Sequence, residues 1–64
     1  MSSREEQFER MLLEIKRSYV ETSEILNQLK DEHKTKTIRY RELLSLKLMY
    51  AEMISLYKSY GLSD

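Results

Sequence analysis

The sequence contains no cysteine and no proline, and its single glycine is Gly61. The lack of cysteine excludes disulfides and thiolate metal sites. A zinc site would have only one imidazole ligand, because His33 is the sole histidine. Without proline or an earlier glycine, no residue of the first sixty forces the chain to turn. We therefore expect a helical chain with no cofactor and no metal.

The sequence also shows no pattern typical of a membrane-spanning segment or a signal peptide. The first residues lead directly into a charged run, with no apolar region behind it. The longest apolar-rich stretch, residues 43–60, is interrupted by Lys47, Glu52 and Lys58. The prediction is a soluble, cytoplasmic protein that does not bind membranes.

Small size is the main constraint on how this chain can be stable. A chain of 64 residues buries only about 60% of the surface that its unfolded form exposes. Natural proteins of this size usually gain stability from disulfides, a metal or a partner chain. With the first two excluded, oligomerisation remains, and we expect a homo-oligomer, most simply a dimer.

The first predicted helix covers residues 3–32. Ser3 followed by Glu6 forms a capping-box pattern, which marks a helix start. Apolar and small side chains then recur at spacings of three and four, which is typical of a helix packed along one face. This stripe consists of Phe8, Leu12, Ile15, Tyr19, Thr22, Leu26 and Leu29, with Met11 and Ile25 on its flank.

The second predicted helix covers residues 37–60 and has a different pattern. Eleven of the fifteen residues from 43 to 57 are apolar, and they cover more than half of the helix circumference. A helix of this kind needs neighbours on several sides. Gly61 and Leu62 are placed to end it in a Schellman-type cap, with Leu62 against Tyr57.

These patterns predict an all-α fold, a helical hairpin of two long antiparallel helices with its bend in residues 32–38. Residues 1–32 hold five Lys/Arg and eight Asp/Glu, and residues 33–64 hold six and three, so antiparallel packing joins opposite charges. We expect a single domain, 1–64, that pairs into a homodimeric four-helix bundle. The alternative is one continuous coiled-coil helix, whose seam would then contain His33, Lys36 and Lys47.

Catalytic motifs are absent from the sequence, and we interpret the carboxylate pairs as solvated helix faces. The chain is therefore expected not to be an enzyme. The leading hypothesis is a helical protein–protein interaction module, a small regulator or adaptor that acts as a homo-oligomer. Tyrosine and methionine suit adaptable interfaces, and the partner-binding residues are predicted to be Tyr50, Met53, Tyr57 and Tyr60.

An alternative function follows from a cluster of basic residues in the bend, at residues 33–41. Lys34, Lys36, Arg39 and Arg41 lie within eight residues, and four cations at one end of a bundle could contact nucleic-acid phosphates. The net charge of zero argues against general nucleic-acid affinity. Nucleic acid is thus the second predicted partner class, after protein.

Overall fold

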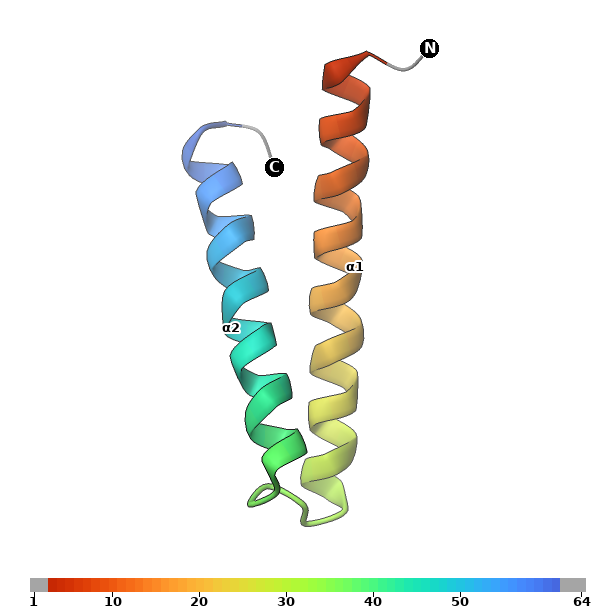
Figure 1. The fold of residues 1–64 in the computed structure, drawn as a ribbon, viewed down its shortest axis with the longest axis vertical. Helices are drawn as coiled ribbons and strands as arrows, with labels where there is room; N and C mark the ends of the chain where they lie inside the picture. The colour runs from red at the N-terminus through yellow and green to blue at the C-terminus, as the bar shows by residue number, and fades with distance from the viewer. Residues whose placement is uncertain (1–2, 62–64) are drawn as a thin grey trace.

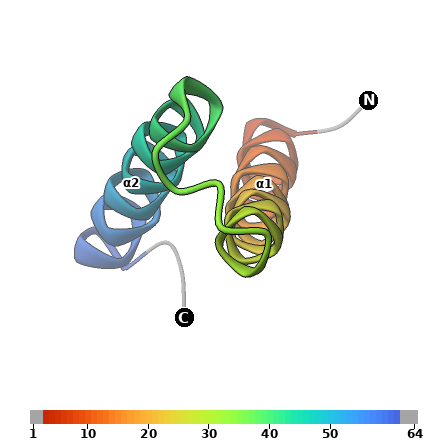
Figure 2. The same ribbon diagram turned by 90° about the horizontal axis from the view of Figure 1, so that it is seen from below.

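The computed structural model describes residues 3–61. Helix α1 runs over Arg4–Asp31 and helix α2 over Ile38–Ser59, and no strand occurs between residues 3 and 61. The two helices pack side by side in opposite directions, joined by a short bend (Figure 1, Figure 2). The prediction of an all-α hairpin is confirmed, and the continuous-helix alternative is wrong.

Helix α1 starts where the capping pattern predicts and buries one face. The Ser3 hydroxyl accepts a hydrogen bond of 3.1 Å from the Glu6 amide, which satisfies one of the free donors at the helix start. Five residues of α1 are buried, and all five belong to the predicted stripe: Leu12, Ile15, Thr22, Leu26 and Leu29. The stripe is therefore the side of α1 that packs against α2.

The bend begins at His33, which adopts the left-handed conformation with a φ of 60°. The His33 amide donates to the Lys30 carbonyl at 3.0 Å, and the Lys34 amide donates to the Leu29 carbonyl at 2.8 Å. This pair of bonds is the Schellman motif, in which glycine usually occupies the left-handed position. Histidine has a Cβ, so its presence there costs conformational energy.

Thr37 ends the bend and starts α2. Its hydroxyl accepts a hydrogen bond from the Tyr40 amide at 3.2 Å and donates one to the Lys34 carbonyl at 2.9 Å. The first bond caps the helix start, and the second ties the cap to the bend. The chain can therefore reverse direction in residues 32–37 without glycine or proline.

Helix α2 contacts α1 through large side chains whose tips stay partly exposed. The Phe8 and Tyr57 rings pack edge to face with centroids 5.0 Å apart. The Tyr57 hydroxyl lies 3.9 Å from the Met11 sulfur. Near the middle of the hairpin, the Lys47 ammonium lies 5.8 Å from the centre of the Tyr19 ring, a cation–π distance. These contacts leave no residue of Ile38–Ser59 fully buried.

The end of α2 agrees in part with the predicted cap. Gly61 has a φ of 70°, and its amide donates to the Lys58 carbonyl at 3.0 Å. Glycine adopts this left-handed conformation at little cost. The predicted contact of Leu62 with Tyr57 lies outside the described residues.

Candidate interaction surface

A row of apolar side chains runs along α2 beside the helix–helix contact. We call it the outer stripe of α2, and it consists of Leu46, Met49, Met53, Leu56 and Tyr60. The spacing alternates between three and four residues, which places all five on one face of the helix. Four of them are exposed, and the exposed fraction reaches 60% for Leu56 and 74% for Tyr60.

The outer stripe borders a cavity at the open end of the hairpin. This open-end cavity has a volume of about 270 Å³ and is lined by Phe8, Met53, Leu56, Tyr57 and Tyr60. Its lining is almost wholly apolar, and only Phe8 comes from α1. A hollow of this kind can accept an apolar side chain of a docking helix.

Three of the four predicted partner-binding residues meet at this cavity. Met53, Tyr57 and Tyr60 line it together. Tyr50 lies three residues nearer the bend than Met53, is half-buried, and does not line the cavity. The structure therefore groups most of the predicted set and separates one member from it.

The predicted partner-binding set does not include Leu46, Met49 or Leu56. In the sequence, α2 is apolar around much of its circumference, so only residue type distinguishes its side chains, and residue type favours tyrosine. A second heptad-spaced row, offset from the one that faces α1, was the signal that could have found them. Two such rows on one helix predict two packing partners.

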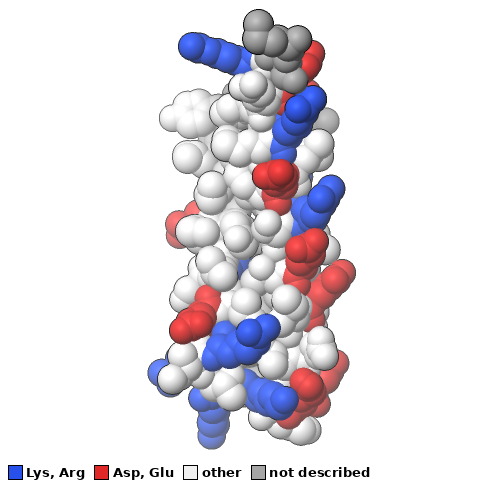
Figure 3. All heavy atoms as spheres, turned by 45° about the vertical axis from the view of Figure 1, so that its right-hand side comes forward, with Lys and Arg blue, Asp and Glu red and all other residues white. Residues whose placement is uncertain are grey.

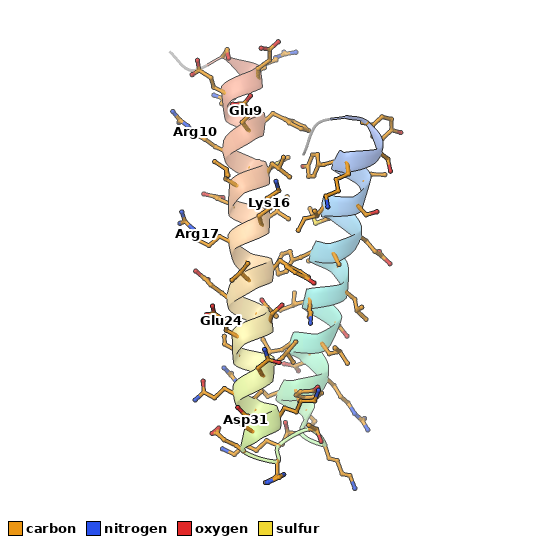
Figure 4. All side chains as sticks on the ribbon, turned by 180° about the vertical axis from the view of Figure 1, so that it is seen from behind. Glu9, Arg10, Lys16, Arg17, Glu24 and Asp31 are labelled. Atoms are coloured by element: carbon orange, nitrogen blue, oxygen red, sulfur yellow. The ribbon has the colours of Figure 1, made fainter. Side chains whose placement is uncertain are left out.

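The face of α1 that points away from α2 is charged. Arg10, Arg17, Glu24 and Asp31 follow one another at intervals of seven residues, which keeps them on one side of the helix. Figure 4 shows these side chains on the side of α1 away from α2. Two large apolar side chains, Leu13 and Val20, are also exposed on α1. Single exposed apolar residues are normal on a protein surface.

The predicted phosphate-contacting residues are all exposed at the bend. They are Lys34, Lys36, Arg39 and Arg41, and we call them the basic bend. Basic side chains gather at the lower end of the molecule in Figure 3, whereas acidic ones follow α1 and the area over α2 is mostly uncharged. Lys34 lies 3.7 Å from the Glu32 carboxylate, which is the one ion pair within residues 3–61. Part of the positive charge is thus offset locally.

Other binding chemistries find little support in the described part of the chain. Between residues 3 and 61, no three His, Asp or Glu side chains are grouped so that they could hold a metal ion. Over the same residues, neither helix has a stretch long and apolar enough to cross a bilayer. The side chains that stand out are therefore those of the outer stripe.

Comparisons of this chain with protein-family models, with curated proteins and with solved structures give no match. Its function must therefore be inferred from its own residues and their arrangement.

Proposed function

We propose that this protein is a non-enzymatic helical interaction module that acts as a homo-oligomer, a small regulator or adaptor working by helix docking in the cytoplasm. The whole chain forms one domain in this proposal. Other helices pack on the outer stripe of α2 and fill the open-end cavity. The absence of cysteine fits a reducing compartment.

The observation that carries the proposal is the difference in exposure between the two helices. Within residues 3–61, seven of the eleven exposed large hydrophobic residues lie on α2 or its cap: Ile38, Leu44, Leu46, Leu48, Met49, Leu56 and Tyr60. Four of these seven, Leu46, Met49, Leu56 and Tyr60, belong to the outer stripe, and a group of exposed apolar side chains on one face typically marks an interaction site. The outer stripe has the heptad spacing that helix-to-helix packing requires.

Two leucines of nearly equal exposure provide a matched test. Leu56 on the outer stripe is 60% exposed, and Leu13 on α1 is 63% exposed. We expect the parent to be an oligomer at micromolar concentration by light scattering. Leu56→Asp should reduce its mass, because a carboxylate in an apolar interface costs several kcal/mol. Leu13→Asp should leave the mass unchanged.

A parent chain that is helical and monomeric at all accessible concentrations would contradict the proposal. Equal losses of mass in Leu56→Asp and Leu13→Asp would also contradict it, since the effect would then not be specific to α2. Circular dichroism of both variants checks that each remains helical.

A further inference from the structure

The hairpin exposes much more surface than a compact chain of its mass. Its accessible surface is 5511 Å², whereas a folded monomer of 7.8 kDa exposes about 4,400 Å². The difference, about 1,100 Å², is comparable with the roughly 800 Å² that each partner buries in a standard protein–protein interface. A partner of ordinary size would therefore remove the excess.

The dimensions of the chain point to the same conclusion. The radius of gyration is 14.3 Å, against about 11 Å for a compact chain of this length and about 14 Å for a compact pair of chains. The smallest extent is 17 Å, so the two helices form a single layer. Domains are usually built from two or more packed layers of secondary structure. The hairpin by itself provides only one.

The order of residues along the outer stripe indicates what supplies that layer. Leu46, Met49, Met53 and Leu56 form the series Leu–Met–Met–Leu, which is symmetric about residue 51. An antiparallel copy of α2, related by a two-fold axis at that level, would place Leu46 opposite Leu56 and Met49 opposite Met53. A two-fold interface requires this kind of self-complementarity.

The polar ends of the outer stripe also match in this arrangement. The same axis places Tyr60 opposite position 42, where the residue is Glu42. The tyrosine hydroxyl can donate a hydrogen bond to the carboxylate, and a bond to a charged acceptor is a strong one. Both ends of a symmetric interface would gain this contact.

Charge distinguishes the antiparallel arrangement from a parallel one. A parallel pair of α2 helices would bring two basic bends, each with four exposed cations, to the same end of the dimer. The antiparallel pair separates them along a molecule 45 Å long, several times the screening length of about 8 Å at physiological salt. Like-charge repulsion therefore favours the antiparallel dimer.

We propose that the occupant of the outer stripe is a second copy of this chain, with the two α2 helices packed antiparallel about a two-fold axis at the level of residue 51. This inference rests on the proposed function, because it names the partner and the geometry of the same surface. Both α1 helices then lie on the outside, where their charged faces meet solvent.

Disulfide trapping tests the geometry directly, because the chain has no native cysteine. Leu46→Cys and Leu56→Cys are prepared separately, one of them with a tag that changes its mass. In the antiparallel dimer, position 46 meets position 56 of the other copy. Position 46 lies about 15 Å along the axis from its own equivalent, well beyond the roughly 7 Å limit between the Cα atoms of a disulfide.

We expect the mixture of the two variants to form a disulfide-linked heterodimer on mild oxidation, and each variant alone to form at least tenfold less cross-linked product. Leu13→Cys, on the far side of α1, is the control. It should cross-link no faster when it is mixed with Leu46→Cys or Leu56→Cys than when it is alone. Circular dichroism and light scattering of each reduced variant establish that it folds and associates like the parent.

The possible outcomes test the dimer geometry and the proposed function separately. Efficient cross-linking of Leu46→Cys to itself would show a parallel pair and overturn the inference, while the interaction module would stand. An oligomer by mass that cross-links neither position 46 to position 56 nor position 46 to itself would also overturn the inference and leave the interaction module standing. A helical monomer by mass would overturn both.

Discussion

The two helices of this hairpin share one interface but differ in how deeply it buries their side chains. Helix α1 has five buried residues on one stripe and a charged opposite face (Figure 4). Helix α2 has no buried residue, although it carries most of the exposed large hydrophobic side chains. The first helix has the pattern of an element with one neighbour, and the second has the pattern of an element that needs more.

The side chains at the contact explain part of this difference. The buried residues of α1 are short, mainly leucine and isoleucine. The half-buried residues of α2 include Tyr40, Lys47, Tyr50 and Tyr57. Long side chains with polar tips cover apolar surface and keep their ends in water. The same contact therefore encloses α1 residues and leaves those of α2 half-buried.

The largest expected effect comes from removing a buried α1 side chain. Leu26 is 5% exposed, and Leu26→Ala should cost about 2–5 kcal/mol, enough to unfold most molecules of so small a chain. Leu56→Ala, at an exposed site of α2, should keep the helical signal at low protein concentration. Urea titration followed by circular dichroism measures both. Equal destabilisation at low concentration would remove the distinction between the helices.

A smaller effect, of opposite sign, is expected where α1 ends. His33→Gly should stabilise the hairpin by about 1 kcal/mol, because glycine adopts the left-handed conformation without the Cβ penalty. Lys36→Gly in the same bend is the control and should stabilise nothing, since Lys36 does not have a positive φ. The urea midpoints of the two variants give the comparison. A loss of stability in His33→Gly would show that its side chain contributes more than its backbone costs.

The start of α2 should be about as sensitive as the end of α1, with the sign reversed. Thr37→Ala removes both the cap of the Tyr40 amide and the bond to the Lys34 carbonyl, and should cost about 1 kcal/mol. Thr35→Ala, at an exposed position in the same bend, should change stability by less than about 0.5 kcal/mol. If Thr37→Ala and Thr35→Ala have the same melting temperature, Thr37 does not determine where α2 begins.

The smallest effect on stability is expected at the basic bend. Replacing Lys34, Lys36, Arg39 and Arg41 with glutamine should change the free energy of unfolding little. Only Lys34 has an ion-pair partner within residues 3–61, and an exposed ion pair contributes about 0–1 kcal/mol. The same variant tests nucleic-acid binding by titration with generic DNA and RNA at two salt concentrations. We expect weak binding by the parent. Submicromolar, salt-sensitive binding that the variant loses would instead make phosphate contact the main function.

Much of the fold could be predicted from local sequence patterns. The Ser3 and Glu6 spacing, the stripe from Phe8 to Leu29 and the position of Gly61 are signals that act over a few residues. The bend was harder to define, because it has neither glycine nor proline. His33 takes the left-handed position that glycine usually occupies, and Thr37 caps α2 without an acidic residue three positions later.

The candidate surface was predicted less completely. Met53, Tyr57 and Tyr60 were predicted from residue type, and they line the same cavity. Tyr50 could not be separated from them on the same grounds, because residue type does not show which of several apolar directions faces α1. Leu46, Met49 and Leu56 became recognisable as a stripe only once the direction of α1 was known.

The sequence by itself determined that this chain is helical, where its first helix starts and which face of that helix is buried, because these properties depend on spacings of three and four residues. Only the tertiary structure decided which apolar side of α2 meets α1 and which remains exposed. The physical reason is that α2 is apolar in several directions, so its own periodicity allows more than one packing. The bend and the facing stripe of α1 select among these packings, and the outer stripe of α2, together with Leu44 and Leu48, stays outside the contact.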